Sequence, residues 1–335
     1  MRIVVLVFAL ALCHAALAQP VPVIFDTDLG PDCDDAGAMA LLHALADAGE
    51  AEILGVVCST KDPWCAPAAD VINTYYGRPD VPVGTLKGPG FLGTSESWFG
   101  GAFNGYLAGH FPNDLQHGSY AEDAVTLYRR LLASADDSSV AVVVVGGMTN
   151  LRDLLVSDPD SISPLTGREL VLRRVRELSV MGGGYPSGHE ANFLVDGPAT
   201  RYMVEHWPTP VVFSGVEIGQ DVLSGPDLWP LPEDNPVRMA YHLWDMNFAW
   251  QFTPDFDPET GIWPHSSFDQ TAVLYAVRGL RDYWTTVSTG RNAVTDDGRN
   301  VWESEPDRDQ AYLVRKMPDD ELAKVIEELM IRASD

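Results

Sequence analysis

The chain has 335 residues, 46% of them hydrophobic, and carries a formal net charge of -26 at pH 7. This acidic balance argues against nucleic acid and anionic membranes as partners, because both repel a negatively charged protein. It favours a neutral or cationic small molecule, or a metal ion, and it leaves the oligomeric state open, a homo-oligomer included.

Residues 1–18 are predicted to be a secretory signal peptide. They combine Arg2 near the start, an apolar run too short to span a bilayer, and small residues before a cleavage after Ala18. We therefore expect a secreted or periplasmic protein. Residues 19–335 contain neither a linker rich in Ser, Gly and Pro nor an internal repeat, so we expect them to form a single domain.

The first two thirds of the chain alternate between apolar runs of strand length and helical patterns. After the run at 21–25 comes AMALLHALADAGE, whose apolar residues have the spacing of a buried helix face. This alternation predicts an α/β fold with an open, mostly parallel, Rossmann-like sheet and helices on both faces. The other predicted strands are 52–58, 81–86, 140–145, 177–181 and 210–215.

Two long irregular stretches stand out from this alternation. Residues 87–119 are rich in glycine and aromatic residues, and form either a lid in which Trp98 and Tyr106 stack on a planar ring or a plain surface loop. Residues 223–263 hold four of the nine tryptophans, and we expect them to cover the same face of the sheet. A helix at 266–280, a hairpin-like region at 283–317 and an amphipathic helix at 318–333 complete the chain.

The strand at 21–25 runs into a loop with five aspartates within ten residues, namely Asp26, Asp28, Asp32, Asp34 and Asp35. Carboxylates at this density repel one another, so a fold collects them only where positive charge or proton donors offset the repulsion. A hard cation with oxygen ligands meets that requirement. The alternative is a solvated acidic loop in which one aspartate caps the helix. In an open α/β sheet, ligands bind at such a strand end.

Three motifs compete for this loop. An EF-hand does not fit, because Pro31 and Gly37 would stand where glycine and glutamate are needed. Phosphatases of the haloacid dehalogenase type resemble FDTDLG in having two aspartates one residue apart at a strand end, but they then need threonine or valine in place of Gly30. The whole stretch DTDLGPDCDDAGAM resembles the signature of the inosine-uridine preferring nucleoside hydrolases.

This resemblance implies calcium-dependent hydrolysis of the N-glycosidic bond of a ribonucleoside to free base and ribose. It implies three carboxylates and one main-chain carbonyl as calcium ligands, namely Asp28, Asp35, Asp269 and Val145. An aspartate of the first loop acts in this family as a base on the attacking water. The loop is longer here than in many members, so Asp32 and Asp34 are both candidates for the base, with Asp34 preferred.

Two later segments carry the resemblance further. MGGGYPSGHEANFLVDGPA resembles the family segment whose glutamate and asparagine bind ribose hydroxyls, which places Glu190 and Asn192 at those positions. In SSFDQTAVLYAV, the better-studied members have a histidine just before the aspartate, as the acid for the leaving base, and this chain has Phe268. Phe268 can stack on the base but cannot donate a proton, and His189 is an alternative donor.

Two other functions stay open on the sequence alone. A phosphatase of the haloacid dehalogenase type would release phosphate with magnesium. A non-catalytic exported protein would keep the calcium site and bind a nucleoside without turnover. The nucleobase that the protein prefers is not encoded in any of these motifs.

Overall fold

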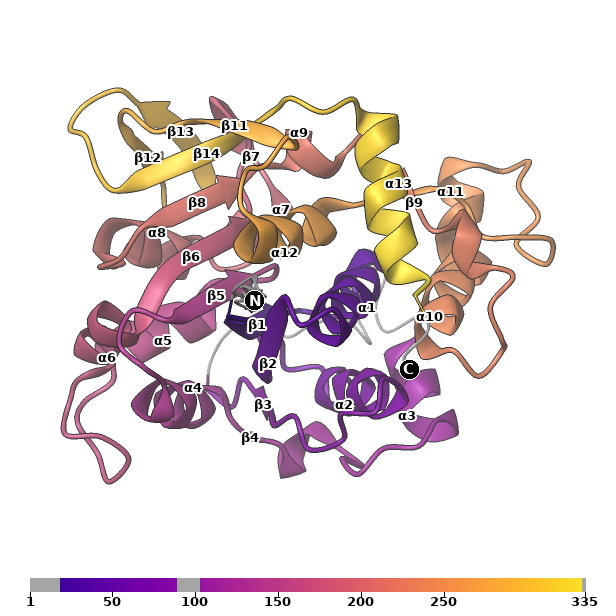
Figure 1. Cartoon of the computed structure of the whole chain (residues 1–335), viewed down its shortest axis with the longest axis horizontal. Coiled ribbons are helices and arrows are strands. Elements are labelled where there is room, and N and C mark those ends of the chain that lie inside the picture. Colours follow the sequence, from indigo (N-terminus) through magenta and orange to yellow (C-terminus); the bar gives the residue numbers. More distant parts are fainter. Residues whose placement is uncertain (1–18, 89–102, 333–335) are drawn as a thin grey trace, which may run out of the picture.

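The computed structural model describes residues 19–88 and 103–332, so the predicted leader at 1–18 and Trp98 lie outside the described residues. Within the described chain, nine strands form one sheet in the order β11-β14-β8-β6-β5-β1-β2-β3-β4 (Figure 1). All neighbours are parallel except β11 and β14, which confirms the predicted open, mostly parallel α/β fold. The strands are β1 (Val21–Thr27), β2 (Ala51–Cys58), β3 (Val83–Thr85), β4 (Glu122–Asp123), β5 (Val140–Val144), β6 (Val175–Met181), β8 (Val211–Ser214), β11 (Trp284–Val287) and β14 (Gln310–Arg315).

The central strands are buried on both faces. Val23 and Phe25 of β1 enter one hydrophobic core, and Ile24 between them enters the other. Strand β5 behaves in the same way, with Val143 in the first core and Val142 in the second. Side chains alternate along a strand, so the part of a strand that is covered on both sides is apolar on both of its faces. This explains why these segments read as unbroken apolar runs.

Helices cover both faces of the sheet, as predicted (Figure 1). On one face lie α1 (Asp34–Asp47), α2 (Cys65–Tyr75), α12 (Phe268–Arg278) and α13 (Asp319–Met330). On the other face lie α4 (Ala124–Ser134), α5 (Thr149–Val156), α6 (Gly167–Arg174) and α8 (Gly197–His206).

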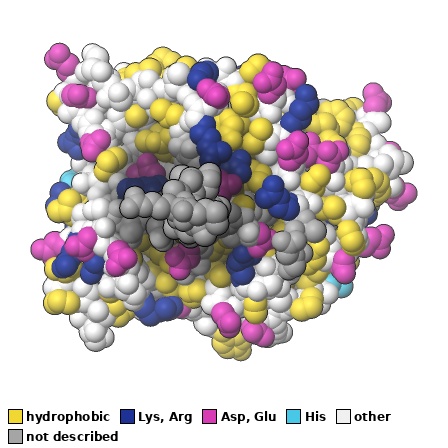
Figure 2. Space-filling view, viewed as in Figure 1, with side chains coloured by type: hydrophobic (Ala, Val, Ile, Leu, Met, Phe, Trp, Pro, Cys, Tyr) yellow, Lys and Arg dark blue, Asp and Glu magenta, His cyan; other side chains and the backbone are white. Residues whose placement is uncertain are grey.

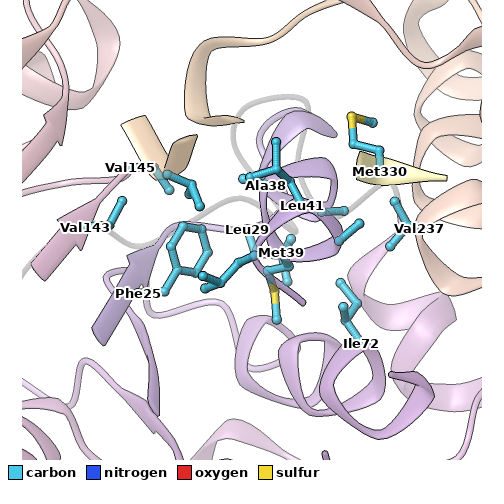
Figure 3. Close-up of a cluster of buried hydrophobic side chains, with 14 of the residues drawn as sticks. Phe25, Leu29, Ala38, Met39, Leu41, Ile72, Val143, Val145, Val237 and Met330 are labelled. Atoms are coloured by element: carbon cyan, nitrogen blue, oxygen red, sulfur yellow. The ribbon is translucent and has the colours of Figure 1, made fainter. Parts of the chain in front are cut away.

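Helix α1 is surrounded by other elements. Its Met39 and Leu41 belong to a core that also contains Phe25 of β1, Ile72 of α2 and Met330 of α13 (Figure 3). A helix that is apolar on most sides is stable only when it is buried in this way. The acidic loop between β1 and α1 is therefore held at both ends by buried elements.

The region predicted to be hairpin-like contains four strands. Strands β12 (Arg291–Val294) and β13 (Arg299–Glu303) form an antiparallel hairpin, and β13 also pairs with β7 (Ser187–His189). Strands β11 and β14 flank this hairpin and extend the main sheet, where β14 runs parallel to β8. Only the hairpin itself follows from local sequence pattern, because the pairing of β14 with β8 joins segments far apart in the chain.

Short elements fill the remaining described chain. They are α3 (Asn104–His110), α7 (Ala191–Leu194), α9 (Val216–Gly219), α10 (Pro236–Trp244), a π-helical turn (Asp245–Ala249), α11 (Trp250–Phe252), the 3-10 turns Gly118–Tyr120 and Pro226–Leu228, and the paired strands β9 (Leu223–Ser224) and β10 (His265–Ser266). No helix among the described residues has the length and apolar character needed to cross a membrane. Acidic, basic and hydrophobic side chains are interspersed over the described part of the face in Figure 2.

Tyr106 does not lie where a lid residue would stack on a substrate at the acidic loop. It lies on α3, where its ring stacks on His110 with a centroid separation of 4.0 Å. Together with Val71 and Tyr75 of α2 it lines a cavity that does not include the acidic loop. Of the two alternatives predicted for 87–119, the position of Tyr106 favours the surface loop, because α3 packs against α2 and Tyr106 lines the cavity there.

Candidate active site

The first aspartate of the loop is hydrogen-bonded inside the protein, away from the cavity. Asp26 is the sixth residue of β1, and its carboxylate accepts hydrogen bonds from Tyr128 Oη (2.8 Å) and Asn150 Nδ2 (3.1 Å). Burial raises the pKa of Asp26 to about 7, against the opposing effect of these hydrogen bonds. Asp26 thus ties β1 to α4 and α5 and does not line the cavity above.

The two aspartates at the start of α1 are held by different partners. Asp35 accepts a hydrogen bond from the Thr27 hydroxyl at the end of β1. The carboxylate of Asp34 accepts hydrogen bonds from the main-chain N–H groups of Phe268 (3.0 Å) and Asp269 (3.1 Å). Free N–H groups at a helix start favour a carboxylate. Asp34 thus joins the first turn of α12 to the acidic loop and brings Asp269 into the site.

The carboxylates of this cluster raise one another's pKa. The pKa values of Asp28, Asp34, Asp35 and Asp269 all lie well above the usual range, first because of burial and then because of the neighbouring negative charges. None of the ion pairs formed by described Lys, Arg and His residues involves these four carboxylates. The cluster therefore needs protons or a cation to offset its charge.

The oxygen donors at this position fit a hard metal ion. Asp32, Asp34 and Asp35 place carboxylate oxygens within 4.8 Å of one another and could hold a metal. This group includes only one of the four predicted ligands, Asp35. Asp28 and Asp269 face the adjoining cavity, and the Val145 carbonyl accepts a hydrogen bond from Asn192 Nδ2 (2.9 Å).

The segment after β6 contributes the other polar side of the site. Asn192 Nδ2 also donates to the Met181 carbonyl (3.3 Å), which directs the amide oxygen away from these carbonyls. The Glu190 carboxylate caps α7 by accepting from the N–H groups of Asn192 (2.7 Å) and Phe193 (3.3 Å), and it also accepts from Gly183 N–H (3.0 Å). Burial raises the pKa of Glu190 to about 7 in spite of these hydrogen bonds.

A cavity of about 490 Å³ lies at the carboxyl ends of β1, β5 and β6, where the sheet topology predicts a ligand. It brings together seven of the nine predicted site residues, and only Asp34 and Asp35 lie behind its surface. The seven are Asp28, Asp32, Val145, Glu190, Asn192, Phe268 and Asp269. The cavity is acidic on the side of the loop, whereas Phe268, Trp244 and Phe252 form an apolar wall.

Sequence reasoning did not identify Trp244 or the pair formed by Asp245 and His265. Trp244 Nε1 donates to the Pro31 carbonyl of the acidic loop (3.2 Å), and Asp245 is hydrogen-bonded to His265 (2.9 Å). The expectation that 223–263 covers the site correctly located this stretch, since α10 and α11 supply two aromatic lining residues. The segment HSSFD, with a histidine a few residues before Phe268, was the available signal for His265.

The fold and the site together define a class of protein, an α/β enzyme with a carboxylate cluster and a small-molecule cavity at the carboxyl edge of its sheet. The family model described as inosine-uridine preferring nucleoside hydrolase matches residues 23–324, and the chain belongs to this family. It is therefore a hydrolase that acts on N-glycosyl compounds. The family predicted from the first loop is confirmed, and it replaces the phosphatase alternative.

Individual relatives are distant in sequence. An inosine-uridine preferring nucleoside hydrolase of Crithidia fasciculata is 24% identical over 242 residues, which cover 68% of this chain and 71% of that protein. The structure of a purine-preferring ribonucleoside hydrolase from Gardnerella vaginalis is similar with a TM-score of 0.67 and 18% identity, covering 93% of this chain and 99% of that one. A plant nucleoside hydrolase, PpNRh1, has a TM-score of 0.63 and 19% identity over 93% and 99% of the two chains. At this identity the two structures support the fold.

Proposed function

We propose that the protein is a calcium-dependent hydrolase that cleaves ribonucleosides to free base and ribose. The observation that carries this proposal is the cavity itself, which has carboxylates at one side and aromatic rings at the other. A ribose has hydroxyl groups that can donate hydrogen bonds to carboxylate and amide oxygens, and a nucleobase has a planar ring on which aromatic side chains can stack. A volume of about 490 Å³ suits a small molecule.

The ribose would bind at the polar side. Asn192 is oriented by its two donated hydrogen bonds, so its amide oxygen is the atom left to accept from a sugar hydroxyl. Glu190 is held by three main-chain N–H groups, two of which donate to Oε2, so Oε1 is the oxygen that keeps acceptor capacity. Because both side chains are fixed before substrate arrives, the ordering cost of binding is low.

Asp32 would take the proton from the attacking water. Its carboxylate lines the cavity, whereas the carboxylate of Asp34 is engaged by two N–H groups of α12. The water oxygen bonds to the anomeric carbon, the C–N bond breaks, and its electron pair leaves with the base. The surrounding carboxylates stabilise the oxocarbenium-like charge that develops on the sugar.

Asp28, Asp35, Asp269 and the Val145 carbonyl would hold the calcium ion. When bound there, calcium would polarise the attacking water and the ribose hydroxyls. The high pKa values of the three carboxylates support this assignment, since they follow first from burial and then from neighbouring negative charge that no ion pair of the described residues offsets. The Val145 carbonyl, already an acceptor for Asn192, has a second lone pair.

The test is release of reducing sugar from a panel of purine and pyrimidine ribonucleosides, before and after treatment with a calcium chelator. We expect release that stops with the chelator and returns with added calcium. Nucleoside binding in calorimetry without sugar release from any member of the panel would instead identify a non-catalytic binding protein. Activity unchanged after removal of calcium would refute the metal assignment while leaving the hydrolase assignment in place.

Export is proposed from residues 1–18 and is tested separately. We expect the native host to release a chain that begins at Gln19, because the small residues before that position suit signal peptidase. Amino-terminal sequencing of protein from the medium or periplasm measures this directly.

A further inference from the structure

A second cavity adjoins the first at its aromatic wall. It has a volume of about 280 Å³ and shares four lining residues with the larger cavity, namely Asp32, Trp244, Phe252 and Phe268. His265 lines only the second cavity. A planar group that stacks on the shared aromatic wall, with its sugar at the carboxylates, would therefore approach His265.

His265 belongs to a fixed pair with a buried carboxylate. Its Nε2 lies 2.9 Å from Asp245 Oδ1, and the side chain of Asp245 has no solvent-exposed area. The second oxygen of Asp245 accepts the main-chain N–H of Trp263 (2.8 Å). Nδ1 of His265 has no hydrogen-bond partner among the described residues and keeps solvent-accessible surface, and the residue lines the second cavity. A carboxylate that accepts the proton of one ring nitrogen orients the ring and leaves the other nitrogen available.

Aromatic packing connects this pair to the acidic loop. The Trp244 ring meets the His265 ring edge to face, with centroids 5.0 Å apart, and Tyr241 packs on His265 in the same way at 5.4 Å. The indole N–H of Trp244 is bonded to the Pro31 carbonyl, next to Asp32 in the chain. The imidazole is therefore held in a fixed position relative to the loop that carries the proposed base.

We propose that His265 is the proton donor to the departing nucleobase and that Asp245 positions it. This inference rests on the proposed ribonucleoside hydrolysis. As the C–N bond breaks, the electron pair stays on the base nitrogens, and the His265 imidazolium passes its Nδ1 proton to the base and becomes a neutral imidazole that still donates Nε2–H to Asp245. The proton taken from water goes to Asp32, and exchange with solvent restores both groups. The position just before Asp269, occupied by Phe268, then supplies stacking only.

The test compares two leaving groups in the calcium-loaded full chain. A purine or pyrimidine needs a proton to depart, whereas nitrophenolate departs without one. We expect His265→Gln to lower kcat/KM for inosine by about 10²- to 10⁴-fold, the usual effect of losing a general acid, and to change kcat/KM for 4-nitrophenyl riboside by less than about threefold. Asp245→Asn should show the same selectivity with a smaller loss, because the ring is still present but less well oriented.

The ratio of the two kcat/KM values is the measured quantity, since it does not depend on how much of a variant is correctly folded. If His265→Gln proves insoluble, Asp245→Asn carries the same comparison. His206→Gln, an exposed histidine on α8, is the matched control and should leave the ratio unchanged. Equal losses on both substrates would show that the pair only holds the segment 245–265 in place, and a selective loss in His189→Gln alone would assign the donor to His189.

Failure of the proposed function has a different signature. If the wild-type protein releases ribose from neither nucleosides nor 4-nitrophenyl riboside, the proposed ribonucleoside hydrolysis itself is wrong. If the wild-type protein cleaves both and the ratio is insensitive to His265 and Asp245, only the present inference is wrong.

Discussion

Two aspartates separated by one residue have different surroundings at the start of α1. Asp32 is partly exposed to the cavity, whereas Asp34 is buried and accepts hydrogen bonds from Phe268 N–H and Asp269 N–H. Two main-chain donors fix the Asp34 carboxylate toward α12, whereas Asp32 lines the cavity in which the attacking water would bind. The surroundings thus support chemistry at Asp32 and positioning at Asp34.

The matched substitutions Asp32→Asn and Asp34→Ala separate these roles. We expect Asp32→Asn to lower kcat by about 10²- to 10⁴-fold while leaving the calcium-bound stability close to that of wild type. Asp34→Ala should reduce the free energy of unfolding by about 1–3 kcal/mol, because it leaves two N–H groups of α12 without their partner. Steady-state kinetics and urea unfolding in calcium buffer measure the two effects. The reverse pattern would return the base to Asp34.

A buried histidine on α1 links stability to pH. His43 bonds to Asn73 Oδ1 (3.0 Å), and burial, with the Arg78 charge nearby, lowers its pKa from 6.5 to about 3. The unfolded chain therefore binds a proton between about pH 6.5 and pH 3 that the folded chain does not. Stability from this group is complete above pH 6.5 and is lost as the pH falls through that window.

We predict that His43→Gln removes this contribution to the pH dependence. Between pH 6 and pH 4, each unit of acidification should lower the unfolding free energy of the wild type by about 1.4 kcal/mol more than that of His43→Gln. Urea unfolding at several pH values measures it, and the difference between the two proteins cancels the contribution of the acidic cluster. Parallel curves for the two proteins would contradict the prediction.

At the scale of elements, the small sheet β7-β13-β12 supports the sugar side of the site. Asn300 on β13 donates to the Gly184 carbonyl (2.9 Å) and accepts from Gly184 N–H (3.0 Å), in the turn between β6 and Glu190. Gly183, the next residue back, has a φ of 76° and donates to Glu190. A turn with positive φ needs outside support to keep one conformation. Asn300 therefore fixes the direction in which Glu190 approaches the cavity.

Asn300→Ala should loosen this turn. We expect a loss of about 1–3 kcal/mol in unfolding free energy, since buried main-chain groups of Gly184 lose their partners. We also expect KM for nucleosides to rise about 5- to 10-fold, equivalent to roughly 1 kcal/mol of lost binding. Val301→Ala, at an exposed position on the same strand, is the control for both measurements. A stability loss without a change in KM would show that the turn does not position Glu190.

At the scale of the whole molecule, negative charge opposes the compact state. The chain has a net charge of -26, and its buried carboxylates meet where β1, α1 and α12 converge. A cation bound there would relieve repulsion among elements that are far apart in sequence. Metal binding would then stabilise the fold as well as the chemistry.

Calcium is therefore expected to raise the melting temperature of the protein. Calcium at about 100 times its dissociation constant should add about 2.7 kcal/mol, which corresponds to several degrees for a chain of this size. Differential scanning calorimetry with calcium, with magnesium and with a chelator measures the shift. Asp35→Ala should abolish the calcium-specific part of it. An equal shift in that variant would place the ion elsewhere on the acidic surface.

Local pattern in the sequence determined the elements and the first half of the site. The apolar run of β1, the aspartates after it and the helical spacing of α1 are contiguous, so one segment predicts both the loop and its place at a strand end. The family resemblance, carried from that loop to later segments, then pointed to Val145, Glu190 and Asn192, which the structure brings to the same cavity.

Only the tertiary structure decided which of these groups face the cavity and what else joins them. Asp34 bonds to α12 because the starts of α1 and α12 meet, although Asp34 and Asp269 are 235 residues apart in the chain. Strand β14 likewise pairs with β8, which is far from it in the sequence. His265 and Asp245 stand 20 residues apart with no periodic relation, and they meet because β10 pairs with β9 while α10 packs on α1. Such contacts depend on how buried faces fit together, which short-range sequence pattern does not record.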